Sequence, residues 1–280
     1  MTAAVLDRPL RAPLGRLLAA EVRWTLRRPR TIIALAALAL APVLMGIGIA
    51  IAGEGSRGGP GGLFGALAGN GFVLPIVAMY MLLPVLLPLL GSMAAADALA
   101  GESAHGTLRG LLLAPVSRGR LLAVKAFGVA VVVWLGVLVV ALSGVVTGLV
   151  LVGSNGLITL SGTTLSVADA LLRIGLAVLW VGFQVFAVAS IALAVSAWTE
   201  HPLVVLAVAL AFVLVSAVVS ALPNTEWIQP YLLPTGWMSL TDVLRDPVPG
   251  TELLRSTVKA LCYSVIGLSL AYGRLSTKDG

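Results

Sequence analysis

Five long stretches of this chain carry no charged residue, and they constrain its fold more than any other feature. They cover residues 31–52, 72–96, 126–152, 174–197 and 203–222. An uncharged apolar run of roughly 18 residues or more is long enough to cross a bilayer as a helix. A sixth stretch, 253–273, is weaker because Arg255 and Lys259 lie in its first turns, although long cationic side chains can reach the membrane surface. The sequence therefore predicts an all-α integral membrane protein with six transmembrane helices, the fourth covering 170–197.

The composition excludes an ordinary water-soluble protein. Of the 280 residues, 59% are hydrophobic and 11% are charged, whereas soluble domains average about half and about a quarter. The net charge of +6 would suggest nucleic acid as a partner of a soluble protein. Here, however, seven arginines lie within the first thirty residues, directly before the first apolar run. This pattern is typical of a cytoplasmic flank, so we expect a lipid bilayer and no nucleic acid as partner.

The basic residues also predict the orientation of the spans. With the amino terminus inside, 13 of the 18 basic residues lie on the inner side and five on the outer side. Positive charge favours the cytoplasmic side of a membrane. We therefore expect a multi-pass protein of the inner (plasma) membrane with both termini in the cytoplasm. The charged region is too long for a cleaved signal peptide, so we expect it to remain in the mature protein.

The segment before the first span has the pattern of an amphipathic helix. Apolar residues recur at helical spacing over residues 9–30, with arginines mostly between them. Such a helix can be a plain topology anchor, or it can lead into the first span and touch a cytoplasmic partner. We divide the chain into this amphipathic segment, 1–30, and a single transmembrane domain, 31–280.

Two segments are expected on the outer side. Residues 53–71 are rich in glycine, which is typical of a flexible loop. Residues 223–252 contain five prolines, together with Trp227, Tyr231 and Trp237, which suit a membrane interface. This pattern predicts short interfacial or re-entrant helices before the last span.

The inner loop 97–125 is unusually polar for so apolar a chain. We expect the second span to continue as a helix through Ala104 and to end at Gly106. Thr107 and Ser117 are good N-cap residues for two further helices, the first of which closes at Pro115. That first helix would place Leu108, Leu111 and Leu112 on one face. Such a face needs a partner in water, although a helical hairpin resting on lipid head groups fits the composition equally well.

The loop also carries a resemblance. The stretch "GESAHGTLRGLLLAPVSRGRLLAVKAFG", about a tenth of the chain, resembles the signature loop of the permeases of ABC-2 type ABC transporters. The six spans, the amphipathic segment and the outer element are similar to this family over nearly the full length. The residues that match its pattern in order are Glu102, Gly106, Thr107, Leu108, Leu112, Pro115, Val116, Ser117, Arg118 and Lys125.

The resemblance implies a function. The loop would be the coupling helix, which docks on a cytoplasmic ABC ATPase subunit, and residues 9–30 would be a connecting helix. Two permeases, identical or paralogous, would work with two ATPases, which hold ATP and Mg. The implied activity is export of a drug, antibiotic, lipid-like molecule or peptide. Arg109 departs from the pattern, because an acidic residue is common there. The expected coupling residues are Glu102, Gly106, Thr107, Leu108, Arg109, Leu111, Leu112, Pro115, Ser117 and Arg118.

The sequence offers no enzyme chemistry of its own. It contains no Gly-x-x-x-x-Gly-Lys-Ser/Thr run, so ATP hydrolysis is expected only in a partner subunit. With two histidines and one cysteine, a metal site is unexpected, and we assign no catalytic residue and no cofactor to this chain. Glu102 and His105 share a helix face, which we interpret as a solvated pair at a helix end.

A few polar residues and prolines stand out within the spans. Asp169 and Arg173 are four apart, which suggests an interfacial ion pair. Prolines in the second span should bend it. Gly144 and Gly148 permit close helix packing. The candidate residues of a translocation path are Pro84, Pro88, Gln184 and Ser190, although hydrogen bonding between helices is the preferred interpretation of Gln184, Ser190 and Ser196.

Two other function classes stay open. One is a secondary carrier or channel, although the twelve acidic residues all lie in loops or at span ends, where they form no chain of carboxylates through the membrane. The other is a membrane assembly factor or regulatory subunit that uses the same loop for docking. Transport by the purified protein in vesicles separates a transporter from an assembly or regulatory subunit. Sensitivity of transport to a proton uncoupler, but not to loss of ATP, would favour the secondary carrier.

Overall fold

The computed structural model describes residues 14–53, 70–104, 117–153 and 156–277. Residues 54–69 of the expected flexible loop and most of the coupling residues lie outside these ranges. The elements, in chain order, are α1 (Leu14–Leu26), α2 (Pro29–Gly53), α3 (Leu74–Leu82), α4 (Leu86–Ala98), α5 (Ala100–Ala104), α7 (Arg118–Leu151), β1 (Leu157–Ile158), β2 (Thr164–Leu165), α8 (Val167–Trp198), α9 (Pro202–Ala221), η2 (Gln229–Tyr231), η3 (Pro234–Leu244) and α10 (Gly250–Thr277).

The predicted spans are present as helices. Within the described residues, five helices are long and apolar enough to cross a membrane, and the bent pair α3–α4 makes a sixth if it forms one span. The bend of 58° falls where the second span contains Pro84 and Pro88, which cannot donate the backbone hydrogen bonds of a continuous helix. The prediction of a bent second span is therefore confirmed.

Several helix boundaries differ from the expected ones. The helix of the third span, α7, begins at Arg118, eight residues before the expected span, because Ser117 caps it. The last helix runs from Gly250 to Thr277 and so exceeds the expected 253–273 at both ends. Residues 157–165 hold a two-stranded antiparallel pairing that the all-α prediction did not include.

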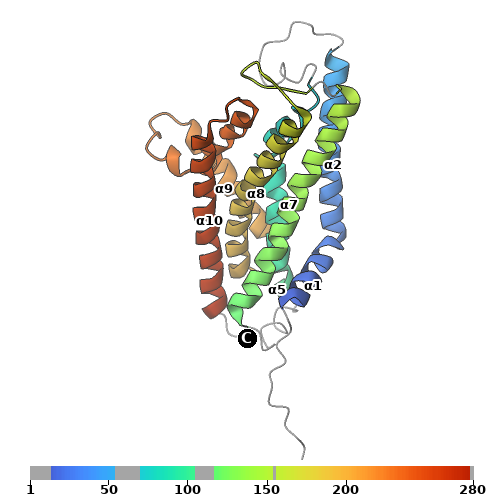
Figure 1. Cartoon of the computed structure of the whole chain (residues 1–280). Helices are drawn as coiled ribbons and strands as arrows, with labels where there is room; N and C mark the ends of the chain where they lie inside the picture. The colour runs from blue at the N-terminus through green and yellow to red at the C-terminus, as the bar shows by residue number, and fades with distance from the viewer. Residues whose placement is uncertain (1–13, 54–69, 105–116, 154–155, 278–280) are drawn as a thin grey trace, which may run out of the picture.

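The helices form one elongated bundle with α7 and α8 near its middle (Figure 1). The side chains of α8 are mostly buried, whereas α2, α9 and α10 expose many large apolar side chains, such as Ile33, Leu203 and Val265. That distribution suits helices that face lipid on the outside of a bundle. The amphipathic α1, the short α5 and the C-terminal end of α10 lie together at one end, here termed the α1 end (Figure 1).

Close helix approach depends on small residues, as predicted for Gly144 and Gly148. A Cβ at Gly144 would come within 2.7 Å of the Pro75 Cα, and one at Gly148 would overlap the backbone of Gly71. Both positions therefore admit only glycine without movement of the α3 segment against α7. The structure confirms this packing prediction.

The segment before α10 contains the short helices that the prolines predicted. The η2 and η3 elements pack beside α9 and α10 at the end opposite α1 (Figure 1). Trp227 and Tyr231 are exposed, as expected at a membrane interface, but Trp237 is buried among the helices.

Candidate functional site

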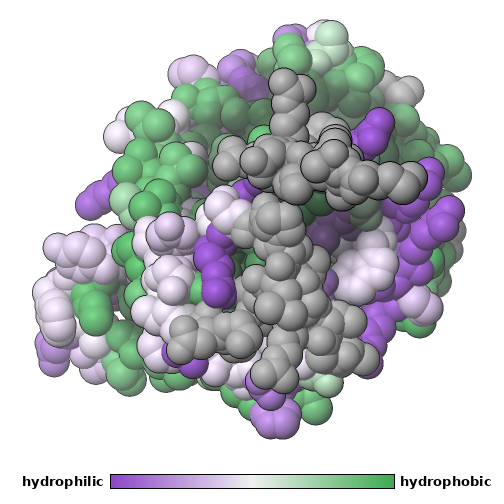
Figure 2. Space-filling model, turned by 90° about the horizontal axis from the view of Figure 1, so that it is seen from below, coloured by the Kyte–Doolittle hydropathy of each residue, from purple (hydrophilic) through white to green (hydrophobic). Residues whose placement is uncertain are grey.

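Polar residues gather at the α1 end of the bundle. Figure 2 views this end and shows hydrophilic residues gathered along one side and in separate patches among the hydrophobic ones. The charged side chains there come from α1, the start of α2, the end of α4, α5 and the first turns of α7. Three stretches that are distant in sequence, residues 21–30, 97–102 and the start of α7, thus contribute to one cluster.

The centre of the cluster is a buried triad of Glu21, Lys125 and Glu102. The Lys125 Nζ donates to both carboxylate oxygens of Glu21, each at 3.0 Å, and to Oε1 of Glu102. Only 4% of the Lys125 side chain is exposed, against 12% for Glu21 and 7% for Glu102. Buried charges are tolerated only when they are paired, so the triad constrains α1, α5 and α7 relative to one another.

Burial also changes the acidity of Glu102. Loss of hydration raises the pKa of its carboxyl above the ordinary value, and the nearby Lys125 ammonium opposes this shift. Gly128, one turn after Lys125, leaves room for the Glu21 side chain, since a Cβ there would lie 2.9 Å from the Glu21 Cγ. Glycine at this position therefore allows α1 to approach α7.

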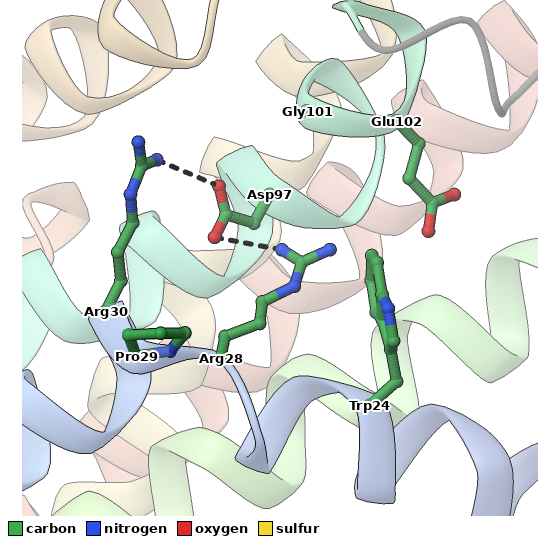
Figure 3. Close-up of a pocket in the computed structure, with 7 residues that line it drawn as sticks. All are labelled: Trp24, Arg28, Pro29, Arg30, Asp97, Gly101 and Glu102. Carbon is green, nitrogen blue, oxygen red and sulfur yellow. Dashed lines mark ion pairs between the residues drawn. The ribbon is translucent and has the colours of Figure 1, made fainter.

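A second ion-pair group lies beside the triad. Asp97 at the end of α4 accepts from the Arg28 guanidinium at 2.9 Å and lies 3.9 Å from that of Arg30 (Figure 3). The Arg28 guanidinium also stacks 3.4 Å from the centre of the Trp24 ring, and the Lys125 Nζ lies 5.3 Å from the same ring. Trp24 therefore joins the two groups through cation–π contacts.

A cavity of about 570 Å³ lies between these groups. Figure 3 shows the residues that line it. Its walls come from the α1–α2 junction on one side and from α4 and α5 on the other, and the Glu102 side chain points toward Trp24. The lining residues are Trp24, Arg28, Pro29, Arg30, Asp97, Gly101 and Glu102.

Glu102 and Lys125 of this cluster flank residues 105–116, which lie outside the described ranges. Ser117, the first described residue after them, caps α7 by accepting a hydrogen bond from the Arg120 backbone N–H at 3.4 Å. Arg118 donates to the Leu275 carbonyl at 3.2 Å and so links α7 to α10. The N-cap prediction for Ser117 is confirmed.

Most of the expected coupling residues cannot be placed, because they lie outside the described ranges. They are Gly106, Thr107, Leu108, Arg109, Leu111, Leu112 and Pro115. The described members are Glu102, Ser117 and Arg118. The interpretation of Glu102 as a solvated helix-end residue is wrong, because its carboxylate is buried against Lys125. Glu102 is thus a buried member of the triad.

Of the four candidate path residues, two lie at or near the α3–α4 bend and two lie in α8. Pro84 is exposed at the α3–α4 bend and lines a cavity of about 240 Å³ with residues of α9 and η3. Pro88 is buried in α4, on the other side of the bend. Gln184 donates to the Ser256 carbonyl of α10 at 3.2 Å, which confirms hydrogen bonding between helices for this residue. Ser190 instead donates to the Phe186 carbonyl of its own helix.

Ser196 and Arg173 show how α8 is held at its two ends. Ser196 Oγ accepts from the Ala100 backbone N–H at 2.9 Å and donates to the Ala96 carbonyl at 3.3 Å, so α8 is bonded to α4 and α5. The predicted Asp169–Arg173 pair is wrong: the Arg173 guanidinium pairs with Asp246 at 3.0 Å. Asp169 instead accepts from the Ser166 hydroxyl at the start of α8.

Sequence reasoning missed several members of the cluster. Glu21, Trp24, Arg28 and Asp97 were not singled out, although Glu21 is the one acidic residue in α1, within a helix that is otherwise basic. A lone carboxylate in such a setting is a signal for a buried cation. Among the described residues, no three His, Cys, Asp or Glu side chains are grouped closely enough to hold a metal ion.

Comparison with known proteins gives one family and no curated relative. The family model described as ABC-2 family transporter protein matches residues 17–245, which is well over half of the chain. No curated protein matches the chain. The matched range begins within α1 and includes the whole charged cluster.

Proposed function

The chain belongs to the ABC-2 transporter family and is a membrane-spanning permease of an ABC transporter, and on this premise we propose that it is the permease subunit of an exporter. The energy comes from ATP that a separate cytoplasmic ATPase subunit hydrolyses with Mg. Two such ATPases work with two permeases, either two copies of this chain or this chain and a close paralogue. The loop 97–125 is the site on which the ATPase docks.

The buried triad is the observation that carries this proposal. A docked ATPase would push residues 107–113. Glu102 and Lys125 flank this segment, and Lys125 donates hydrogen bonds both to Glu102 and to Glu21. Because the charges are buried, the flanks and α1 move together at lower cost than they separate. A push on the loop is thereby passed to α4, α7 and α1 as one body, which is what a coupling element requires.

The proposed orientation places the α1 end in the cytoplasm. The arginine-rich α1–α2 junction and the start of α7 both lie at that end, and the positive-inside rule favours them there. Both termini are then cytoplasmic, and the segment between α9 and α10 faces the outer side.

The cargo class is proposed from the cavity at the α3–α4 bend. Its lining is largely apolar and includes Leu83, Pro84, Val213 and Trp237, with polar atoms only from a few groups such as Tyr80. A cavity of this kind suits an amphipathic molecule, such as a drug, an antibiotic, a lipid-like compound or a peptide. When the docked ATPase moves α4, the angle of the α3–α4 bend would change, and this change would open or close the cavity.

The first experiment measures ATP hydrolysis by the chain purified alone and then co-expressed with its candidate ATPase. We expect no hydrolysis by the chain alone and a stable complex in which the chain stimulates hydrolysis by the ATPase. Leu108→Asp and Leu112→Asp should each lose this stimulation. Leu113→Asp is the matched control, because helical spacing places Leu113 away from the face shared by Leu108 and Leu112.

Two results would contradict the proposal. Normal stimulated hydrolysis and normal transport in both Leu108→Asp and Leu112→Asp would remove the coupling role of the loop. Failure to form a complex with any ATPase, together with transport that is sensitive to a proton uncoupler, would instead favour a secondary carrier.

A further inference from the structure

A second polar cavity lies at the opposite end of the bundle, between α10 and the short helices η2 and η3. Its volume is about 230 Å³. We term it the mixed-charge cavity, because two carboxylates and two cations line it. The lining residues are Glu226, Gln229, Pro230, Thr235, Gly236, Glu252, Arg255, Ser256 and Lys259.

Lys259 is the fixed cation of this cavity. Its Nζ donates to the Leu232 carbonyl at 2.8 Å and to the Thr235 hydroxyl at 3.1 Å, which holds the ammonium against the wall formed by η2 and η3. An ammonium has three N–H donors. Two are engaged by these described partners, so one donor is left to point toward an anionic ligand.

The other charges are held more loosely. Arg255 and Glu252 lie one turn apart on α10 at 3.9 Å, with 65% and 62% of their side chains exposed. An exposed pair at this distance contributes little to stability. Both groups can therefore turn toward a ligand at low cost, the guanidinium toward an anion and the carboxylate toward a cation, and Glu226 provides a second carboxylate on the facing segment.

The neighbours of the cavity are those of a membrane surface. Trp227 and Tyr231, on the same segment as Glu226, are 74% and 70% exposed. Leu254 and Val258, on the same helix as Lys259, also face outward. Aromatic residues collect at the level of lipid head groups, and apolar side chains on a spanning helix contact acyl chains. A ligand with a polar head and an apolar tail fits both surroundings at once.

We propose that the mixed-charge cavity binds a zwitterionic head group that carries a phosphate and a primary ammonium, as in phosphatidylethanolamine. The phosphate accepts hydrogen bonds from Lys259 and Arg255, and the ammonium donates to Glu226 and Glu252. The described lining includes no aromatic side chain, whereas quaternary ammonium groups are recognised chiefly by aromatic faces. The cavity therefore prefers ethanolamine to choline.

The same chemistry exists in a soluble zwitterion, and the exposed apolar neighbours favour the lipid. Binding is measured by native mass spectrometry of the purified full-length chain in detergent micelles, titrated with phosphatidylethanolamine, phosphatidylcholine or phosphatidylglycerol. Glycerophosphoethanolamine, which has the head group but no acyl chains, is added as a competitor. We expect phosphatidylethanolamine to bind more tightly than the other two lipids by about tenfold, the size expected for charge-assisted hydrogen bonds.

The variants separate the two charges of the head group. Lys259→Gln and Arg255→Gln should each weaken binding of phosphatidylethanolamine by about tenfold. The double variant Glu226→Gln and Glu252→Gln should remove the preference over phosphatidylcholine while lipid still binds through its phosphate. Arg245→Gln is the matched control, because Arg245 is an exposed arginine that pairs with Asp242 outside the cavity, and we expect no change.

Arg255→Gln keeps the test valid if Lys259→Gln disturbs the local fold, since the Arg255 side chain is exposed. Equal binding of the three lipids, or unchanged binding in Arg255→Gln and in the double glutamate variant, overturns the proposal. Competition by glycerophosphoethanolamine at concentrations similar to the lipid keeps the site but assigns it to a soluble zwitterion. Because lipid binding is read without an ATPase, failure here is distinguishable from failure of the proposed transport function.

Discussion

The two ends of the helix bundle hold their buried and half-buried cations in different ways. At the α1 end, Lys125 and Arg28 pair with carboxylates on other helices. At the opposite end, Arg173 and Lys259 donate mainly to backbone carbonyls of the segment between α9 and α10. The reason is the local backbone: continuous helices use their own carbonyls, whereas short 3-10 helices and turns leave carbonyls that need donors.

This difference assigns different tasks to the two sets of cations. The cations of the α1 end join whole helices to one another, so that the loop between α5 and α7 starts from a rigid base. The cations of the opposite end fold one irregular segment onto α8 and α10. Removal of a cation should therefore weaken the whole bundle at the first end and mainly the local segment at the second.

The largest effect is expected for Lys125→Met. The substitution leaves the Glu21 and Glu102 carboxylates buried without their common cation, and loss of one partner of a buried pair costs about 3–5 kcal/mol. Denaturant unfolding of the purified protein in detergent micelles measures the change in the free energy of unfolding.

The control for this prediction removes all three charges together. Glu21→Gln, Lys125→Met and Glu102→Gln in one chain leave no uncompensated charge, so this triple variant should regain most of the lost stability. A triple variant that is less stable than Lys125→Met alone would show that the triad does not act as one charge-paired unit.

The next effect is expected for Arg173→Gln at the opposite end. It removes the ion pair with Asp246 and the hydrogen bonds to the Val243 and Arg245 carbonyls. We expect a loss of about 2 kcal/mol, in the range for hydrogen bonds to charged groups. Amide hydrogen exchange should increase mainly over residues 242–248.

Asp246→Asn tests which partner matters there. The two carbonyl acceptors of Arg173 remain in this variant, so the loss should be smaller than in Arg173→Gln. Equal losses in the two variants, or a gain of exchange spread evenly over the chain, would contradict the local role assigned to Arg173.

The two ends also differ in how much of them the sequence predicted. Helices, the proline bend and the Ser117 cap follow from local rules, because each depends on residues within a few positions. Ion pairs do not: Lys125 and Glu21 are 104 positions apart. The local spacing rule paired Arg173 with Asp169 because the two are four apart, whereas its partner Asp246 is 73 positions away.

The polar residues within the spans were easier to interpret than the charges at the ends. Gln184 was expected to bond between helices because an unpaired amide is costly in a membrane, and it donates to α10. That rule specifies the need for a partner without naming it. For Glu102 the rule could not be applied, because its position after the second span suggested a solvated helix end. Only the packing of α1, α5 and α7 buries it against Lys125.

A pH titration examines the triad without removing its cation. Burial raises the pKa of the Glu102 carboxyl above its ordinary value of 4.5. The folded protein then binds this proton more tightly than the unfolded chain does, so the contribution of Glu102 to stability is complete below pH 4.5 and declines as the pH rises through the raised pKa.

Glu102→Gln isolates this contribution from those of other titrating groups. We expect the free energy of unfolding of the native chain, relative to that of Glu102→Gln, to fall as the pH rises from about 4 to about 7. A relative stability that is constant or that increases over this range would mean that Lys125 outweighs burial at Glu102.

The smallest effect is expected for Ser117→Ala, which tests whether the start of α7 depends on its cap or on the ion pairs. The Ser117 hydroxyl accepts from the Arg120 N–H at 3.4 Å, a long hydrogen bond at an exposed position. We expect a loss of about 0.5 kcal/mol, the low end for an N-cap substitution, and Ser117→Asp should retain native stability because aspartate caps equally well. Unfolding in micelles reads both variants. A loss in Ser117→Ala as large as that in Lys125→Met would mean that the start of α7 is stabilised mainly by its cap. The triad would then not be the element that fixes α7 relative to α1 and α5.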